Sequence, residues 1–179
     1  MGGPPVYIVR LVFPAAMVLA IGAMAVACGG GGSLSAEEYF EKLEAIGNEA
    51  QEKEDAALPS EEEAANPAPE EQKQTGIELL NSVAEINQDA FDKADGLNPP
   101  DDIRQTHDDL IAAGRDLVQK FQDLAGQAED IPPEGIEDFF NSQVFVESTF
   151  APLDEACFAL QAMADDREIE VNLHCAPEE

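Results

Sequence analysis

The segment from residue 103 to 128 carries apolar side chains at a helical period, and this regularity constrains the fold more than any other feature of the chain. One row alternates spacings of four and three residues, and a second row lies beside it at intervals of seven. The first row is Ile103, His107, Leu110, Gly114, Leu117, Phe121, Leu124 and Ala128, and the second is Ile111, Val118 and Ala125. Residues at these spacings share one face of an α-helix, so the segment predicts one side of a helix bundle.

Two more helices are expected before this segment. Ser35 and Glu38 match the capping-box pattern, which predicts a helix over residues 36–57. A second amphipathic helix is expected over residues 70–95, and Asn98 is placed to cap the helix that follows. Because the connection there is short, the second and third helices should be antiparallel neighbours.

The last helix is expected to be interrupted. It should run from about residue 134 to about residue 165, and Pro152 inside it lacks the backbone N–H that a continuous helix requires. We therefore expect a kink or break near residues 150–151. Apolar and polar residues then alternate over 169–175, which predicts an extended tail with one buried face. The predicted fold class is all-α: an antiparallel bundle of about four helices with a kinked or split last helix and an extended C-terminal tail.

The first 33 residues differ in composition from the rest of the chain. They hold no acidic residue and one basic residue, Arg10, which precedes an apolar run over 11–28. A basic start, an apolar core and small residues at the exit are typical of a secretory signal peptide. An uncleaved membrane helix is the alternative, although this run is short for a span, which needs about 20 residues.

The apolar run ends in Ala25-Val26-Ala27-Cys28, and glycines follow. These residues resemble the lipobox of bacterial lipoproteins, with Ala25 in place of the usual Leu. The resemblance implies that the chain is cut before Cys28 and that the Cys28 thiol receives a lipid, whose acyl chains, such as palmitate, form an anchor. It divides the sequence into a signal peptide over 1–27, a glycine-rich tether over 28–33 and a helical bundle domain over 34–179.

The cysteine count agrees with a lipid on Cys28. Three cysteines in an exported chain leave one without a partner. If Cys28 carries the lipid, Cys157 and Cys175 remain, and we expect them to form a disulfide in an oxidising compartment and to pin the tail to the last helix. Metal ligation by this pair with His174 is the alternative, but its spacing suits a closed zinc site poorly.

Parts of the mature chain resemble uncharacterised helical lipoproteins of bacteria. The likeness rests on Pro99 and Pro100 with His107 downstream, and on the segments 156–161 and 169–175. It covers about half of the mature chain and implies no known activity.

His107 lies on the apolar face of the third expected helix, near its N-terminus. One interpretation is a ligand for haem or a metal ion held inside the bundle. The other is a hydrogen-bonded core histidine whose neutral form is favoured by the helix N-terminus. The Glu-x-x-His pattern of bundle metal sites is missing, because Arg104 stands three residues before His107. His174 should face solvent, because it lies between the apolar positions of the tail.

Acidic runs and phenylalanines are further candidates for binding. The runs at 61–63, 70–71 and 101–102 either collect divalent cations weakly or are solvated helix faces, since no calcium-loop pattern is present. The segment 92–96 comes nearest to such a loop. A set of aromatic side chains around the last helix either forms core or lines an apolar pocket: Phe139, Phe140, Phe145, Phe150 and Phe158.

The charge of the chain limits its partners. It holds 38 acidic and 9 basic residues, for a formal net charge of -29 at pH 7. Removal of the signal peptide takes Arg10 away and makes the mature chain still more acidic. The remaining bases are scattered singly, which is inconsistent with a nucleic-acid-binding surface. Cationic ligands or proteins are the partners that this charge favours.

No catalytic motif is present. Neither histidine lies in a nucleophile elbow or a papain-like context, and no glycine-rich phosphate loop follows a strand. We therefore expect a non-enzymatic lipoprotein, anchored in the cell membrane and facing outside the cytoplasm, that acts by binding or as a surface component. The alternative is a carrier of haem or a divalent metal ion that uses His107, and a hydrolase is the least favoured possibility.

Overall fold

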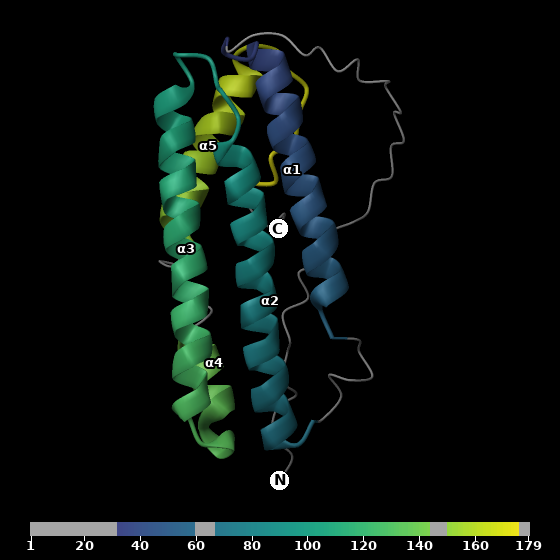
Figure 1. Cartoon of the computed structure of the whole chain (residues 1–179), viewed down its shortest axis with the longest axis vertical. Coiled ribbons are helices and arrows are strands. Elements are labelled where there is room, and N and C mark those ends of the chain that lie inside the picture. The colour runs from purple at the N-terminus through teal and green to yellow at the C-terminus, as the bar shows by residue number, and fades with distance from the viewer. Residues whose placement is uncertain (1–31, 60–66, 144–149, 176–179) are drawn as a thin grey trace. The chain divides into compact units, whose positions relative to one another are not determined.

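The computed structural model describes residues 32–59, 67–143 and 150–175, all within one compact unit that spans Gly32–Cys175. This part of the chain is helical and contains no strand, so the predicted all-α class is confirmed there (Figure 1). Its elements are α1 (Ala36–Ala57), α2 (Pro69–Asp95), α3 (Arg104–Asp130), the 3-10 helix η1 (Pro133–Gly135), α4 (Ile136–Gln143) and α5 (Ala151–Asp165).

The helices α2 and α3 form a central antiparallel pair, as the short connection between them predicts (Figure 1). Helix α1 packs on α2, and α5 packs on α3, both toward the end of the pair where α2 passes into α3. At the other end, η1 and α4 pack mainly against α2. The two ends of the central pair are therefore covered by different elements.

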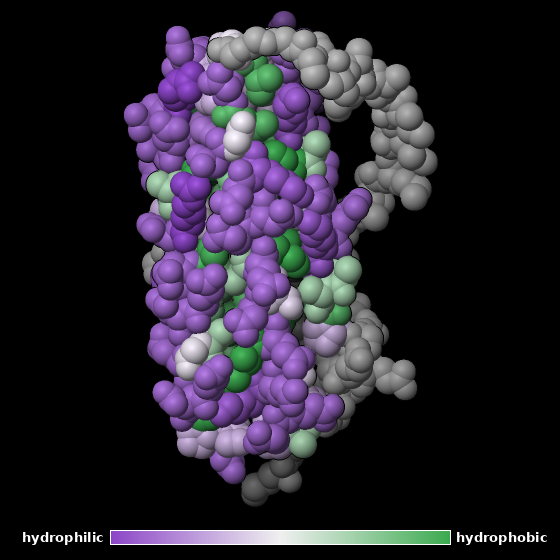
Figure 2. All heavy atoms as spheres, in the orientation of Figure 1, coloured by the Kyte–Doolittle hydropathy of each residue, from purple (hydrophilic) through white to green (hydrophobic). Residues whose placement is uncertain are grey.

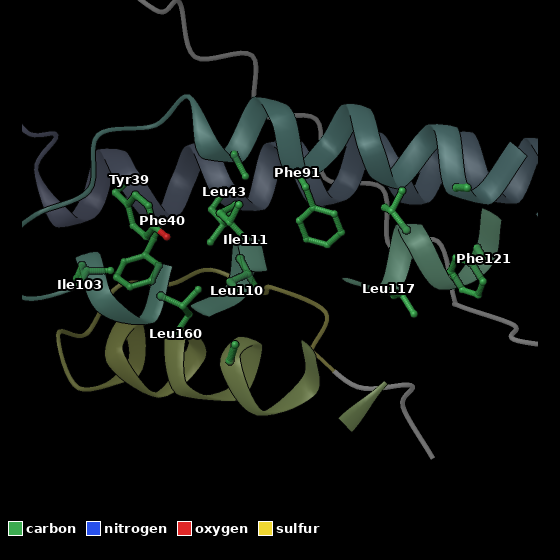
Figure 3. Close-up of a cluster of buried hydrophobic side chains, with 14 of the residues drawn as sticks. Tyr39, Phe40, Leu43, Phe91, Ile103, Leu110, Ile111, Leu117, Phe121 and Leu160 are labelled. Atoms are coloured by element: carbon green, nitrogen blue, oxygen red, sulfur yellow. The ribbon is translucent and has the colours of Figure 1, made fainter. Parts of the chain in front are cut away.

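The apolar rows of residues 103–128 face the core as predicted, and every member of both rows is buried. The other helices contribute Tyr39, Phe40 and Leu43 from α1, Leu80, Ala84, Phe91 and Ala94 from α2, and Ala156, Leu160 and Ala164 from α5. Phe40, Ile103 and Leu160 meet where α1, the start of α3 and α5 converge (Figure 3). The core thus joins residues that lie far apart in the sequence.

Two glycines allow aromatic rings to approach a helix backbone closely. A Cβ atom built on Gly114 of α3 would lie 2.3 Å from the ring of Phe91 on α2. A Cβ atom on Gly76 of α2 would lie 2.3 Å from the ring of Phe140 on α4. Both distances are far below carbon–carbon contact, so each glycine is needed for its ring to pack where it does.

The beginning of α1 follows the predicted capping box. Ser35 Oγ accepts from the backbone N–H of Glu38 at 3.2 Å, and the Ser35 backbone N–H donates to Glu38 Oε2 at 3.1 Å. Leu34 N also donates to Asn98 O at 2.8 Å, so the chain joins the bundle directly before α1.

The expected cap of α3 by Asn98 is wrong. The helix begins at Arg104, after a turn in which the N–H groups of Ile103 and Arg104 both donate to Pro100 O. Successive prolines disfavour helical backbone in the residues that precede them, which delays the start of the helix. Asn98 Oδ1 instead accepts from the Arg104 guanidinium at 3.3 Å.

Helix α5 begins at Ala151 and carries Pro152 in its first turn, where a missing N–H costs nothing. A new helix therefore starts where the break was predicted. Residues 144–149, which include Phe145, lie outside the described residues.

The tail after α5 forms neither helix nor strand, and its half-buried residues alternate with exposed ones as predicted. Ile169, Val171 and Leu173 are half-buried against the core, whereas the residues between them are exposed. Cys157 and Cys175 form the predicted disulfide, with an S–S distance of 2.14 Å.

Hydrophilic side chains dominate the face of the molecule shown in Figure 2, and hydrophobic residues show mainly between the helices. This pattern is expected of amphipathic helices that bury one stripe. None of the helices in the described ranges is both long and apolar enough to cross a membrane.

Candidate functional site

His107 lies in the first turn of α3 and is buried, with 3% of its surface exposed. Its Nδ1 lies 3.0 Å from Oη of Tyr39 on α1, and the His tautomer decides which of the two atoms donates. The two rings are arranged edge to face, with centroids 5.7 Å apart. The structure therefore gives His107 a specific polar partner inside the core (Tyr39 is shown in Figure 3).

Burial favours the neutral form of both rings of this pair. It lowers the pKa of His107, although the carboxylates of Asp108 and Asp95 act in the opposite direction. Burial also raises the pKa of Tyr39 well above its usual range, with a further contribution from Asp108. A neutral pair linked by one hydrogen bond is suited to a structural role in the core.

The haem or metal site predicted at His107 is not accompanied by a cluster of metal ligands in the described part of the chain. Among the residues that the structure describes, no three His, Cys, Asp or Glu side chains lie together in a way that could hold a metal ion. Tyr39 also occupies the Nδ1 side of the ring. Haem or metal binding by His107 remains a prediction.

The disulfide is the centre of a set of contacts that holds the tail between α5 and α1. Gln161 of α5 uses both ends of its amide: Nε2 donates to Val171 O at 3.0 Å, and Oε1 accepts from Leu173 N at 2.9 Å. On the α1 side, Asn172 N donates to Glu44 Oε1 at 2.7 Å. The tail therefore links two helices that share few direct contacts.

His174 is exposed, as the alternation predicts, and has a positive φ of 52°. Its Nε2 lies 3.0 Å from Oδ1 of Asn48 on α1. It thus adds a second contact between the tail and α1, and the expectation of a purely solvated side chain is too simple.

Four exposed charges form a ring between α1 and α2. Lys53 and Lys93 each contact Glu49 and Asp89, with N–O distances of 2.7–2.9 Å. Hydrogen bonds from the two lysines lower the pKa of both carboxyls. These four ion pairs link α1 to α2, but their exposure to solvent limits their contribution to the free energy of unfolding.

The acidic runs have no metal-like geometry in the part of the chain that the structure covers. Asp101 pairs with Arg104 and Asp102 with Arg167, so the run at 101–102 lies beside bases. In the segment nearest to a calcium loop, Asp95 Oδ2 accepts from Arg115 at 2.9 Å. The run at 61–63 lies outside the described residues.

The phenylalanines do not behave as one group. Phe139, Phe140 and Phe150 are half-buried and pack against the core, in agreement with the core interpretation. Phe158 is 51% exposed, so the prediction that it belongs to the core is wrong. On α5 it lies opposite to Leu160, which faces inward.

Sequence reasoning singled out His107 but not its partner. A buried tyrosine hydroxyl needs a hydrogen-bond partner, and the position of Tyr39 on the apolar face of α1 is the one signal that pointed to such a pair. Pairing the two residues requires knowing how α1 and α3 meet.

The predicted lipidation site, Cys28, lies outside the described residues. Comparisons with protein-family models, with curated proteins and with solved structures found no match for this chain. The functional interpretation therefore rests on the residues of this chain alone.

Proposed function

We propose that this protein is a lipoprotein, anchored through Cys28 in the cell membrane, whose helical bundle faces outside the cytoplasm and acts by binding rather than by catalysis. The observation that carries the proposal is the sequence Ala25-Val26-Ala27-Cys28 at the end of an apolar run, followed by glycines. In this proposal the glycines tether the lipid anchor to the bundle.

The disulfide supports this assignment. Cys157 and Cys175 are bonded to each other, so Cys28 is left over from the three cysteines of the chain. Disulfides persist in compartments outside the reducing cytoplasm, which is where a lipoprotein is exported. Lipidation of Cys28 would leave no free thiol.

A binding role is supported by the chemistry of the described residues. The exposed helix faces are rich in carboxylates, and the buried His107–Tyr39 pair is held inside the core by a hydrogen bond. An acidic surface attracts cationic partners and repels anionic ones.

The anchor is tested by metabolic labelling with an alkyne-bearing fatty acid in a bacterial host that expresses the full chain. The wild-type protein should incorporate the label, and the Cys28→Ala variant should not. A Cys157→Ala/Cys175→Ala double variant is the matched control, because it also lacks cysteines but should still be labelled. Equal labelling of wild type and Cys28→Ala would reject the anchor.

A further inference from the structure

The outer face of α5 differs from the outer faces of the other helices. Its exposed positions include Ala151, Phe158, Ala159 and Ala162, and the only exposed acid among them before the last turn is Glu155. By contrast, most exposed positions of α3 carry charged or amide side chains. Helix α5 thus presents an apolar strip, unlike the hydrophilic outer face of α3.

Phe158 stands near the middle of this strip. It is 51% exposed, and the other large hydrophobic side chain exposed to a similar degree in the described chain is Leu58, at 50%. The neighbouring alanines are small, so a partner's side chains can approach the helix closely on both sides of the Phe158 ring. An exposed aromatic side chain with room around it is typical of an anchor for protein association.

The charges around the strip are acidic. Glu155 lies on the same face, and Asp165 and Asp166 are exposed at its C-terminal end. Arg167 is turned away, because its guanidinium donates to Met163 O and to a carboxylate oxygen of Asp102. A partner that matches this surface combines an apolar face with flanking lysines or arginines.

A second copy of the chain fits the strip poorly. Both copies would bring the same acidic flanks together, with a formal net charge of -29 on each. The strip is one face of a 15-residue helix, which a single helix of opposite charge can cover along its length.

We propose that the outer face of α5 docks a basic amphipathic helix of another protein, with Phe158 as the apolar anchor and Glu155, Asp165 and Asp166 as its charge partners. This inference rests on the binding role proposed above, for which it names the partner class. It does not depend on the lipid anchor.

Isothermal titration calorimetry of the full chain in a neutral detergent tests the docking. The probe is a synthetic amphipathic helical peptide of leucine and lysine, and a peptide of the same composition in scrambled order controls for charge. Salt at about 0.15 M screens diffuse attraction between the acidic protein and the basic peptide. The amphipathic peptide should bind the wild type at least about tenfold more tightly than the scrambled one.

Two variants with matched exposure locate the site. Phe158→Ser should weaken the binding of the amphipathic peptide about tenfold, whereas Leu58→Ser should leave it unchanged. Because both side chains are half exposed, neither change should disturb the fold, which circular dichroism checks. Phe158→Leu keeps an apolar anchor and should restore most of the affinity.

Three results would overturn the docking proposal. They are equal affinity of the two peptides, equal effects of Phe158→Ser and Leu58→Ser, and a wild-type dimer in sedimentation analysis that Phe158→Ser dissociates. Peptide binding in a chain that fails the labelling test would reject the anchor and leave the docking site in place.

Discussion

The two ends of the central α2–α3 pair are built differently. At one end, α1, α5 and the disulfide-bonded tail enclose the pair, and Tyr39, Phe40, Ile103 and Leu160 have no exposed surface. At the other end, η1 and α4 cover the pair, and the rings of α4 are only half-buried. We call these the enclosed end and the α4 end. The difference indicates that stability is concentrated at the enclosed end, because local stability follows buried apolar contacts.

The largest effect should come from the disulfide at the enclosed end. A Cys157→Ser/Cys175→Ser variant loses a bond between residues 18 apart, which is worth about 3 kcal/mol in the chain-entropy description. Urea denaturation should show this loss. Amide exchange should rise in α5 and the middle of α1 more than in α4, and a uniform rise would contradict the comparison.

Alanine substitutions at the two glycines that contact aromatic rings compare the stability of the two ends directly. Gly114→Ala should cost about 2 kcal/mol, because the new methyl group meets the buried ring of Phe91. Gly76→Ala should cost less, since the half-buried ring of Phe140 can turn toward solvent and alanine favours the helix by about 1 kcal/mol. Thermal unfolding of both variants measures the difference.

A second substitution tests the cause of the Gly114 effect. Phe91→Leu should be tolerated better in the Gly114→Ala background than in the wild type, because it removes the ring that the methyl group meets. Additive losses in a double-mutant cycle would show that the two residues do not interact as described.

A smaller loss of stability is expected at low pH, because His107 lies at the enclosed end. Burial lowers the pKa of His107, so the folded state binds a proton there less readily than the unfolded state, whose histidine pKa is about 6.5. The stability from the neutral ring is fully present above that value, and it falls as the pH drops below it toward the lowered folded-state pKa. Denaturation midpoints at pH of about 7.5 and 5.5 measure the fall.

The His107→Leu variant is the control for this pH effect. It removes the titrating ring but keeps an apolar side chain, so its stability should depend less on pH over the same range. An unchanged pH dependence would show that His107 does not cause the effect.

The smallest effect is expected at the α4 end. Lys73 of α2 donates to the carbonyl oxygens of Glu129 and Ile131 at 2.7 and 2.9 Å, and so caps the C-terminus of α3. Lys73→Met keeps the aliphatic chain but removes the donor, which should cost about 0.5–1 kcal/mol. Amide exchange should rise in the last turn of α3, and Lys42→Met on α1 should have no such effect.

Local patterns predicted the helices well, because their causes lie within a few residues. The capping box of α1, the apolar rows of α3 and the proline at the start of α5 each depend on neighbouring positions. The exception is the start of α3, where two prolines set up a turn and Asn98 contacts Arg104 instead of capping the helix.

Contacts between distant residues could be predicted only in part. The disulfide was predicted from the cysteine count together with an expected lipid on Cys28, and neither needs knowledge of packing. The pair of Tyr39 and His107 could not be found in this way, since the two residues are 68 positions apart and many other core residues share their pattern. The prediction that Phe158 belongs to the core was wrong, because helical spacing alone does not show which face of a short apolar helix is covered.

The sequence by itself determined the class of fold and the helix that forms one side of the core, because periodicity depends on the order of residues alone. It predicted the pairing of Cys157 with Cys175 on the condition that Cys28 carries a lipid. Only the tertiary structure decided that Tyr39 forms a hydrogen bond with His107, that the tail links α5 to α1, and that Phe158 faces solvent. Each of these depends on how helices orient against one another, and that orientation is set by the packing of the whole core.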